Sequence, residues 1–593
     1  MAGLWLLLPG CMAHADRIVA DGGSTDYKIV IDPKASASEQ HAAAELQTFL
    51  EKICGARLSI TQEAGAGPKI FVGPGLALER LSGGIELAGL GDEGFVIRTV
   101  GPHLVLAGGR PRGTLYACYE FLDRYLGCRW FTPKVSRIPA RKTIRIPDID
   151  DRKIPVFEYR DPYYAVALDG DWAARNRTNG WQARLGAKHG GRVVYRGFVH
   201  TFYSLVPPDE YFADHPEYYS QIEGKRTHEK AQLCLTNPDI AAIAADNVRQ
   251  WLQEMPEADI VSVSHMDGYR ECECDPCKTM TQREGSRAGP LIHFVNQVAD
   301  LIRDDHPDVA IDTLAYTFSR TPPTSIRPRP NVIVRVCTGG CVSHPLGTCS
   351  DPKNHRYWQD LAGWSKLSDR VYVWDYVSNY NHYLLPLPNI HSFHPNIKYF
   401  LDHGVKGVFE LGNYKGTGAF AELRSYILAR CMWDPDCDWE QQMDEFLETY
   451  HGAAAGFIRQ YIDLLSRKVL DEDIHVYIWD PPTSPAAPYL TSDIVARADR
   501  LFDRAQSAVA DDPPRLRRVE KDRLPLQYVK LSRPKELFDS YEQFNEAVGE
   551  FARVAADWSI DRSNEGATLA PQLKKWRDTA AARRAAEAAS GAE

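Results

Sequence analysis

Eight apolar runs between residues 155 and 416 constrain the fold of this 593-residue chain more than any other feature. Longer helical or irregular segments separate them. Near-continuous apolar strands that alternate with helices indicate a parallel sheet covered on both faces, and eight such strands predict a (β/α)8 barrel of the TIM type. The eight runs are VFEYRD, VVYRGFVHTF, QLCLTN, ADIVSVSHMDG, IDTLAYTF, NVIVRVC, RVYVWDY and VKGVFELG.

The residues before this series predict a small α/β domain over residues 16–150. An amphipathic helix is expected in SASEQHAAAELQTFLEKICG, because Ser36 and Glu39 form a capping box and Gly55 stands at its end. Short strands are expected at YKIVID, RLSITQ, KIFVG, GFVIRTV and HLVLAGG, and a second helix at TLYACYEFLDRYLG. We place the barrel at residues 151–420 and an α-helical C-terminal region at residues 421–593. The fold class is therefore α/β.

The N-terminus reads as a signal peptide over residues 1–15. The apolar run LWLLLPG is too short to span a bilayer, and AHA at Ala13 to Ala15 is typical of a signal-peptidase site. These features predict a secreted or periplasmic protein with no membrane span. The sequence LPGC, which ends at Cys11, loosely resembles a lipoprotein cleavage site and leaves lipid anchoring open.

Charge and composition narrow the class of partner. The net charge is −10, the pI is near 6.0, and we find no basic run interleaved with aromatic residues. Nucleic acid is therefore not an expected partner. The sequence does not indicate an oligomeric state.

Polar side chains gather where the apolar runs end, and in a barrel the carboxyl ends of the strands form the active-site face. Carboxylates at that face act as acids, bases or charge stabilisers, and aromatic neighbours offer faces on which sugar rings stack. This pairing describes a glycoside hydrolase, which needs two carboxyl groups around one scissile bond. The candidate catalytic residues are Glu410, Asp375 and Asp267, and the candidate substrate contacts are His200, Asn237, His265, Trp374, Tyr376 and Asn413. Each carboxylate could instead cap a helix or pair with an arginine, and each contact could instead support its neighbours.

Two groups of cysteines leave their chemistry open. Cys272, Cys274 and Cys277 have CxCxxC spacing, which fits disulfides in an exported protein, or zinc with a fourth ligand such as Cys234. The same alternatives hold for the group Cys337, Cys341 and Cys349, where His344 is either a ligand or a loop residue. We assign no metal and no cofactor to the predicted active site.

Residues from about 155 to 455 resemble the bacterial domain of unknown function 4838, whose characterised members form glycoside hydrolase family 163. The resemblance rests on HTFYSLVPPDEYFADHPEYY, QLCLTNPDI, SVSHMDGYRECECDPC, CVSHPLGTC, VYVWDYVSNYNHYLLPLPNI and VKGVFELGNY. The preceding domain resembles the small α/β domain that stands before the barrel in hexosaminidases and α-glucuronidases.

This resemblance implies an endo-β-N-acetylglucosaminidase that acts on a glycan or glycoprotein and cuts between the two core GlcNAc residues of N-glycans. In the substrate-assisted scheme it implies, the 2-acetamido group of the substrate is the nucleophile. Strand-end position makes Glu410 the general acid/base and Asp375 the acetamide polariser, with Asp267 as the alternative partner. Related barrels carry their pair at the end of the fourth strand, which favours Asp267. An exo-hexosaminidase, an α-glucuronidase and a catalytically silent glycan-binding protein are the alternatives.

Overall fold

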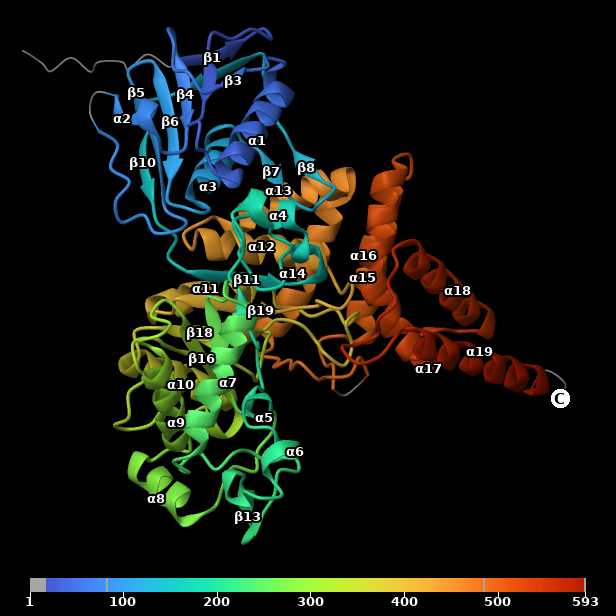
Figure 1. Cartoon of the computed structure of the whole chain (residues 1–593). Coiled ribbons are helices and arrows are strands. Elements are labelled where there is room, and N and C mark those ends of the chain that lie inside the picture. Colours follow the sequence, from blue (N-terminus) through green and yellow to red (C-terminus); the bar gives the residue numbers. More distant parts are fainter. Residues whose placement is uncertain (1–16, 82–83, 484–485, 591–593) are drawn as a thin grey trace, which may run out of the picture. The chain divides into compact units, whose positions relative to one another are not determined.

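The computed structural model describes residues 17–81, 84–483 and 486–590, and the predicted signal peptide therefore lies outside the described residues (Figure 1). The chain forms two compact units. The first comprises the residues up to Trp130, Ser136–Pro155 and Leu185–Gly191, and the second comprises Phe131–Val135, Val156–Arg184 and the residues from Arg192 onward.

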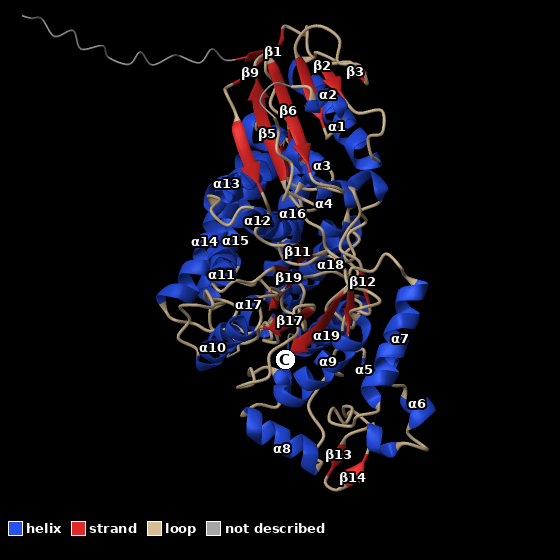
Figure 2. Ribbon diagram, turned by 60° about the vertical axis from the view of Figure 1, so that its left-hand side comes forward, coloured by secondary structure: helices blue, strands red, loops and turns tan. Residues whose placement is uncertain are grey.

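The first unit is built on a six-stranded mixed sheet whose order is β10-β5-β6-β4-β2-β3. Helices α1 and α3 both pack against this sheet (Figure 2). The bounds of its elements are β2 (Lys28–Val30), α1 (Ala37–Cys54), β3 (Ile60–Thr61), β4 (Lys69–Val72), α2 (Leu76–Glu79), β5 (Phe95–Val100), β6 (His103–Gly108), α3 (Gly113–Glu120) and β10 (Asp150–Lys153), with two small pairs, β1 (Arg17–Asp21) with β9 (Thr143–Ile146) and β7 (Arg129–Trp130) with β8 (Ser136–Arg137).

The ends of helix α1 confirm the sequence prediction. The Ser36 hydroxyl accepts a hydrogen bond from the Glu39 backbone N–H, and the Glu39 carboxylate accepts one from the Ser36 backbone N–H. Gly55 ends the helix with a φ of 77°, a left-handed conformation that glycine adopts without a steric penalty. Local chemistry therefore sets both ends of this helix.

The second unit contains a seven-stranded, all-parallel sheet in the order β11-β19-β18-β17-β16-β15-β12. The sheet is curled, and its two edge strands are not hydrogen-bonded to each other, so it forms an open barrel. The strands are β11 (Tyr159–Tyr163), β12 (Tyr195–Arg196), β15 (Ile260–Ser262), β16 (Ala310–Ala315), β17 (Val332–Cys337), β18 (Val371–Tyr376) and β19 (Gly407–Leu411).

The expected third strand, QLCLTN, does not join this sheet, and a complete eight-stranded barrel is not observed among the described residues. The backbone of this segment bonds to a neighbouring loop instead: Ser220 N–H donates to the Gln232 carbonyl, and Cys234 N–H donates to the Tyr218 carbonyl. Strand β12 therefore pairs directly with β15.

Asn179 bridges the open edge between β11 and β12. Its backbone N–H donates to the Arg160 carbonyl and its carbonyl accepts from Val193 N–H, at 3.2 and 3.0 Å. Its side-chain amide accepts from Arg160 N–H at 2.9 Å and donates to the Glu158 carbonyl at 2.8 Å. One asparagine thus satisfies backbone groups that a further strand would otherwise pair.

Helices surround the curled sheet and then continue alone to the C-terminus. The helices between the strands include α4 (Gly170–Arg175), α5 (Phe202–Leu205), α6 (Pro208–Tyr211), α7 (Ile240–Glu254), α8 (Asp275–Glu284), α9 (Ala288–Ile302), α10 (Pro352–Leu367) and α11 (Ile390–Asp402). After β19 come α12 (Ala421–Trp433), α13 (Trp439–His451), α14 (Ala455–Asp471), α15 (Ser492–Ala508), α16 (Pro513–Ser532), α17 (Pro534–Leu537), α18 (Tyr541–Asp557) and α19 (Ala570–Ser590). The C-terminal region is therefore helical, as predicted.

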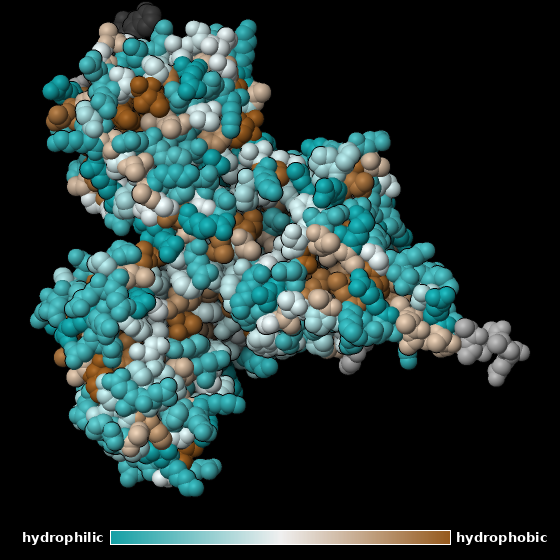
Figure 3. All heavy atoms as spheres, turned by 45° about the vertical axis from the view of Figure 1, so that its right-hand side comes forward, coloured by the Kyte–Doolittle hydropathy of each residue, from teal (hydrophilic) through white to brown (hydrophobic). Residues whose placement is uncertain are grey.

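On the face shown in Figure 3, hydrophilic residues predominate and hydrophobic residues occur in small scattered groups. Within the described ranges, none of the helices has the length and apolar character that crossing a membrane requires.

We expect Asn179→Ala to destabilise the second unit. The substitution removes two side-chain hydrogen bonds to backbone at the open edge of the barrel, one buried and one partly buried, which typically lowers the free energy of unfolding by about 1–3 kcal/mol. Urea unfolding followed by tryptophan fluorescence measures the change. Asn237→Ala is the matched control, since the Asn237 side chain accepts from Asp239 N–H in a surface turn. Equal effects of the two substitutions would contradict the bridging role.

Candidate functional site

A cleft of about 500 Å³ opens at the carboxyl ends of the barrel strands. Side chains at alternate positions of the strands line it, because successive residues of a strand point to opposite faces. Its lining residues are Tyr163, Trp181, Gln182, Phe198, Val199, His200, Asp267, Leu314, Tyr316, Cys337, Trp374, Tyr376, Tyr380, Phe409, Leu411, Tyr414, Trp479 and Glu565.

The walls of the cleft are aromatic. The Trp181 and Phe198 rings stack with centroids 4.2 Å apart, and Tyr163 stacks on Tyr414 at 4.6 Å. Such rings present flat apolar faces held by their neighbours. The cleft can therefore bind a ligand with flat apolar faces and polar edges.

A buried ion pair lies beneath the cleft. Arg335 donates two hydrogen bonds to the Asp312 carboxylate, at 2.6 and 3.0 Å, and both side chains are almost fully buried. Burial raises the pKa of Asp312 to about 6, against the opposing charge of Arg335, so the pair is ionised at pH 7. The Arg335 guanidinium also lies 4.3 Å from the Phe198 ring centroid and 5.6 Å from that of Trp374. These contacts hold the rings of Phe198 and Trp374, which we call the aromatic floor of the cleft.

Asp267 is the carboxylate that follows β15. Three hydrogen bonds hold its loop: the Gln232 amide exchanges two with the backbone groups of Met266, and the Thr317 hydroxyl donates one to the Gly268 carbonyl. Burial and the nearby Asp267 charge raise the pKa of Tyr316 above its usual range. A protonated phenol thus stands beside the Asp267 carboxylate.

Glu565 is the second carboxylate of the cleft and was not predicted from the sequence. It lies between α18 and α19, where its backbone N–H donates to the Tyr380 carbonyl at 3.2 Å. The Tyr414 hydroxyl donates to the Glu565 carboxylate at 3.0 Å. No strand-end signal marks this position, because a loop of the helical region brings it to the cleft.

The two predicted histidines have different environments. His200 lines the cleft with a φ of 57°, a left-handed conformation uncommon for a residue with a side chain. Its Nδ1 lies 2.8 Å from the His265 carbonyl. His265 is buried, with Nε2 3.0 Å from the Ser319 hydroxyl, and burial lowers its pKa to about 4. His265 is therefore neutral at pH 7 and supports the loop instead of lining the cleft.

Glu410 and Asp375 require a correction, because the structure places both on the other face of the sheet. Phe409 and Leu411 line the cleft from β19, so the side chain between them points outward. In the same way Asp375 lies between Trp374 and Tyr376, which both line the cleft. Their position at strand ends was predicted correctly, but the strand period of two directs these carboxylates toward the covering helices.

The outward pair Asp375 and Glu410 is buried side by side in register on β18 and β19. Asp375 accepts hydrogen bonds from the Thr338 hydroxyl and the Tyr376 N–H, and burial raises its pKa to about 6. Glu410 is 1% exposed, and its Oε2 has no hydrogen-bond partner among the described residues. Burial, followed by the charge of Asp375, raises the pKa of Glu410 well above 4.5.

The two predicted asparagines also lie away from the cleft lining. Asn237 closes the turn before α7, and the buried Asn413 donates to the Ser378 hydroxyl at 2.7 Å. Of the predicted residues, the cleft therefore brings together Asp267, His200, Trp374 and Tyr376. Of the lining residues missed by sequence reasoning, Trp181 and Glu565 come from loops away from the strand ends, and Tyr414 follows the end of β19.

The greater part of the second unit matches a known protein family. Residues 130–463, more than half of the chain, match the family described as "Domain of unknown function (DUF4838)", and the chain belongs to this family. Residues 24–121 match the description "Glycosyl hydrolase family 67 N-terminus". A search of curated proteins finds no match.

Several solved structures are similar to the chain. A family GH115 4-O-methyl-alpha-glucuronidase with specificity for decorated arabinogalactans is 14% identical, with 93% of this chain and 78% of that chain covered and a TM-score of 0.57. A mutant beta-hexosaminidase from Streptomyces plicatus, in complex with its product GlcNAc, is 11% identical, with coverages of 75% and 93% and a TM-score of 0.41. The first similarity shows a shared fold.

We expect Glu410→Gln to change how stability depends on pH. The folded protein keeps a proton on Glu410 that the unfolded chain releases, so this carboxyl lowers the stability of the wild type as pH rises above about 4.5 toward the raised pKa. Glutamine carries no charge, so the variant should gain stability relative to the wild type between about pH 5 and pH 8. Urea unfolding at both pH values measures the difference. The exposed Glu257→Gln is the control, and parallel profiles for Glu410→Gln and the wild type would contradict the prediction.

Proposed function

We propose that this protein is a glycoside hydrolase that acts on N-acetylhexosaminides, and that it is an endo-β-N-acetylglucosaminidase of N-glycans. The observation that carries the proposal is the cleft itself, in which Asp267 and Glu565 stand among aromatic walls at the carboxyl ends of the strands. Two carboxyl groups beside a surface for stacking sugar rings are what glycoside hydrolysis requires. The resemblance in sequence supports the finer substrate assignment.

In the proposed reaction, the acetamide oxygen of the substrate attacks the anomeric carbon as the glycosidic C–O bond breaks. The leaving oxygen takes a proton from one carboxylic acid, while the second carboxylate balances the positive charge of the oxazolinium. Water then attacks the anomeric carbon, gives its proton to the first carboxylate, and restores the acetamide. We assign these two roles to the pair Asp267 and Glu565.

The charge of the cleft favours a neutral sugar over a uronic acid. Among the described residues that line the cleft there is no lysine or arginine, whereas two carboxylates are present. The Arg335 guanidinium beneath the floor is bound to Asp312. The carboxylate of a glucuronide would therefore meet like charges among the lining residues, with no lysine or arginine of that lining to bind it. This charge distribution favours an N-acetylhexosaminidase over an α-glucuronidase of similar fold.

Substrate specificity can be tested with glycoproteins. The purified protein is incubated with complex-type and high-mannose N-glycoproteins and, separately, with aryl α-glucuronides. We expect free glycans that lack one GlcNAc, with that GlcNAc left on the protein, as read by mass spectrometry of both products. Release of glucuronic acid, or the absence of product from every substrate, would overturn the proposed specificity.

We expect Asp267→Asn and Glu565→Gln each to lower turnover by at least ~100-fold, the usual scale for loss of an acid–base group. Steady-state rates on a released-glycan assay measure this loss, with far-UV circular dichroism to confirm folding. Glu410→Gln should keep turnover within about threefold of the wild type, because its side chain points away from the cleft. A loss in Glu410→Gln as large as that in Asp267→Asn would return the acid role to Glu410.

An aryl glycoside separates the two catalytic roles. Its phenolate leaves without protonation, so this substrate should restore much of the rate to the variant that lacks the general acid and little to the variant that lacks the charge-balancing group. Equal rescue of both variants would contradict a division of roles.

A further inference from the structure

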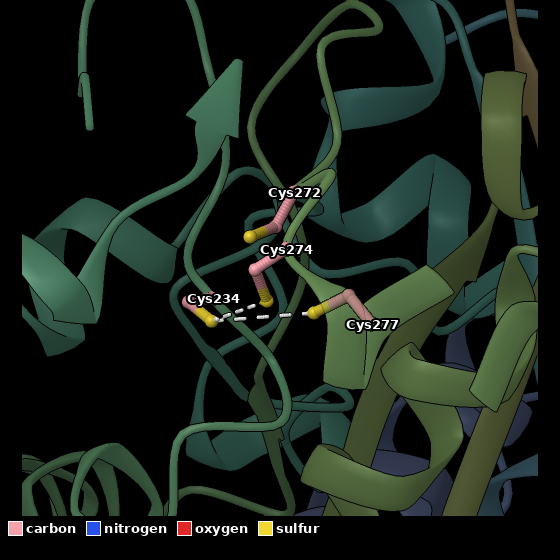
Figure 4. Close-up of side chains that lie close together, drawn as sticks. All are labelled: Cys234, Cys272, Cys274 and Cys277. Atoms are coloured by element: carbon pink, nitrogen blue, oxygen red, sulfur yellow. Dashed lines mark hydrogen bonds between the residues drawn. The ribbon is translucent and has the colours of Figure 1, made fainter. Parts of the chain in front are cut away.

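Four cysteines of the second unit converge on one point, outside the cleft. Cys234 comes from the segment that fails to join the sheet, and Cys272, Cys274 and Cys277 come from the loop before α8 and its first turn (Figure 4). All four are buried and none is in a disulfide. Their sulfur atoms all lie within 4.8 Å of one another.

The spacing of the sulfurs is that of a tetrahedral metal site. Zinc binds thiolates at about 2.3 Å, so the sulfurs of a regular tetrahedron lie about 3.8 Å apart. The Sγ atom of Cys234 is 3.6 Å from that of Cys274 and 4.0 Å from that of Cys277. Disulfides would pair the sulfurs two by two, whereas here one sulfur has two neighbours at nearly equal distance.

Hydrogen-bond donors surround these sulfurs, as thiolates require. The Gln221 N–H donates to Cys272 Sγ at 3.3 Å, and the Arg226 guanidinium donates to the same sulfur at 3.6 Å. The Thr236 hydroxyl lies 3.1 Å from Cys277 Sγ. The positive end of helix α8 adds to this, because Cys274 is its N-cap residue. These groups offset the net negative charge of a zinc ion with four thiolates.

We propose that Cys234, Cys272, Cys274 and Cys277 bind a structural zinc ion. The ion joins the segment around Cys234 to the loop that carries Asp267. A backbone hydrogen bond of 2.8 Å from Glu273 N–H to the Gln221 carbonyl already connects that loop to the hairpin of β13 (Gln221–Ile222) and β14 (Lys225–Arg226). The proposal does not depend on the identity of the substrate.

A second cluster, formed by Cys341, His344, Cys349 and His475, carries the same inference independently. Its ligand atoms also lie within 4.8 Å of one another. Cys341 Sγ is 3.5 Å from His344 Nδ1, and Cys349 Sγ is 3.9 Å from His475 Nδ1. A tetrahedral zinc site with two sulfurs and two nitrogens places sulfur and nitrogen about 3.6 Å apart.

The second ring nitrogen of each histidine faces a polar group: that of His475 lies at hydrogen-bond distance, and that of His344 makes an ion-pair contact. His475 Nε2 lies 3.1 Å from the Ser350 hydroxyl, and His344 Nε2 lies 3.5 Å from the Asp473 carboxylate. Metal-bound histidines usually have such partners on the second nitrogen. We infer a second zinc site here, which fastens the loop after β17 to residues 473–475 of the helical region. Cys337, grouped with these cysteines by sequence, instead lines the cleft.

Metal content of the full-length protein tests both sites. Inductively coupled plasma mass spectrometry of protein expressed with zinc should give about two zinc ions per chain. Cys277→Ser should lose one of them, and His475→Gln should lose the other. The controls Cys54→Ser and His355→Gln, which lie outside both clusters, should keep both. A variant that keeps both ions overturns the site it was meant to remove.

A second measurement needs no variant. Protein grown with cobalt in place of zinc should show the sulfur-to-cobalt charge-transfer band and the visible bands of tetrahedral cobalt. When the zinc protein is unfolded and then alkylated, with or without prior chelation of the zinc, every cluster thiol should react, which shows that it is reduced. Wild-type protein with no zinc, with iron in its place, or with the cluster cysteines paired in disulfides would overturn the proposal.

Discussion

The ion pair between Arg335 and Asp312 is the interaction on which the barrel interior depends. Neighbouring strands β16 and β17 direct both side chains inward, where an unpaired charge would be very unfavourable. Two hydrogen bonds satisfy Asp312, and Arg335 also donates to the Phe198 carbonyl at 3.3 Å. Removing one partner of such a pair typically costs about 3–5 kcal/mol, because the other charge is left buried. The pair therefore holds the Phe198 and Trp374 rings of the aromatic floor in place.

The alternation of side chains along a strand then divides the charged groups between two environments. Residues in phase with Arg335 and Asp312 face the interior and the cleft, whereas Asp375 and Glu410 are out of phase and face the covering helices. Both members of the outward pair have raised pKa values, and Glu410 Oε2 has no hydrogen-bond partner among the described residues, which suits a neutral, buried acid. Asp375 and Glu410 are therefore adjacent in sequence to residues that line the cleft, yet their own side chains lie outside it.

The helical C-terminal region takes part in the site as well as extending the chain. It contributes Trp479 and Glu565 to the cleft and His475 to the second cysteine–histidine cluster. The backbone of this helical region also pairs with the loop after β17, where the Val342 N–H donates to the Val476 carbonyl at 2.8 Å. A barrel with an open edge and short strands therefore receives part of the lining of its cleft from sequence far beyond its last strand.

Several features could be predicted from the sequence alone. The capping box of Ser36 and Glu39, seven of the eight strands and the helical C-terminal region follow from local patterns, because hydrophobic period and capping depend on neighbouring residues. The spacing of Cys272, Cys274 and Cys277 also allowed a zinc site with Cys234 as the fourth ligand. The tertiary structure alone decided that QLCLTN leaves the sheet, that Glu410 faces outward and that Glu565 reaches the cleft. The register of β19 with its neighbours decides which face Glu410 takes, and partners in distant segments decide the places of QLCLTN and Glu565. Local sequence specifies neither the register nor the partners.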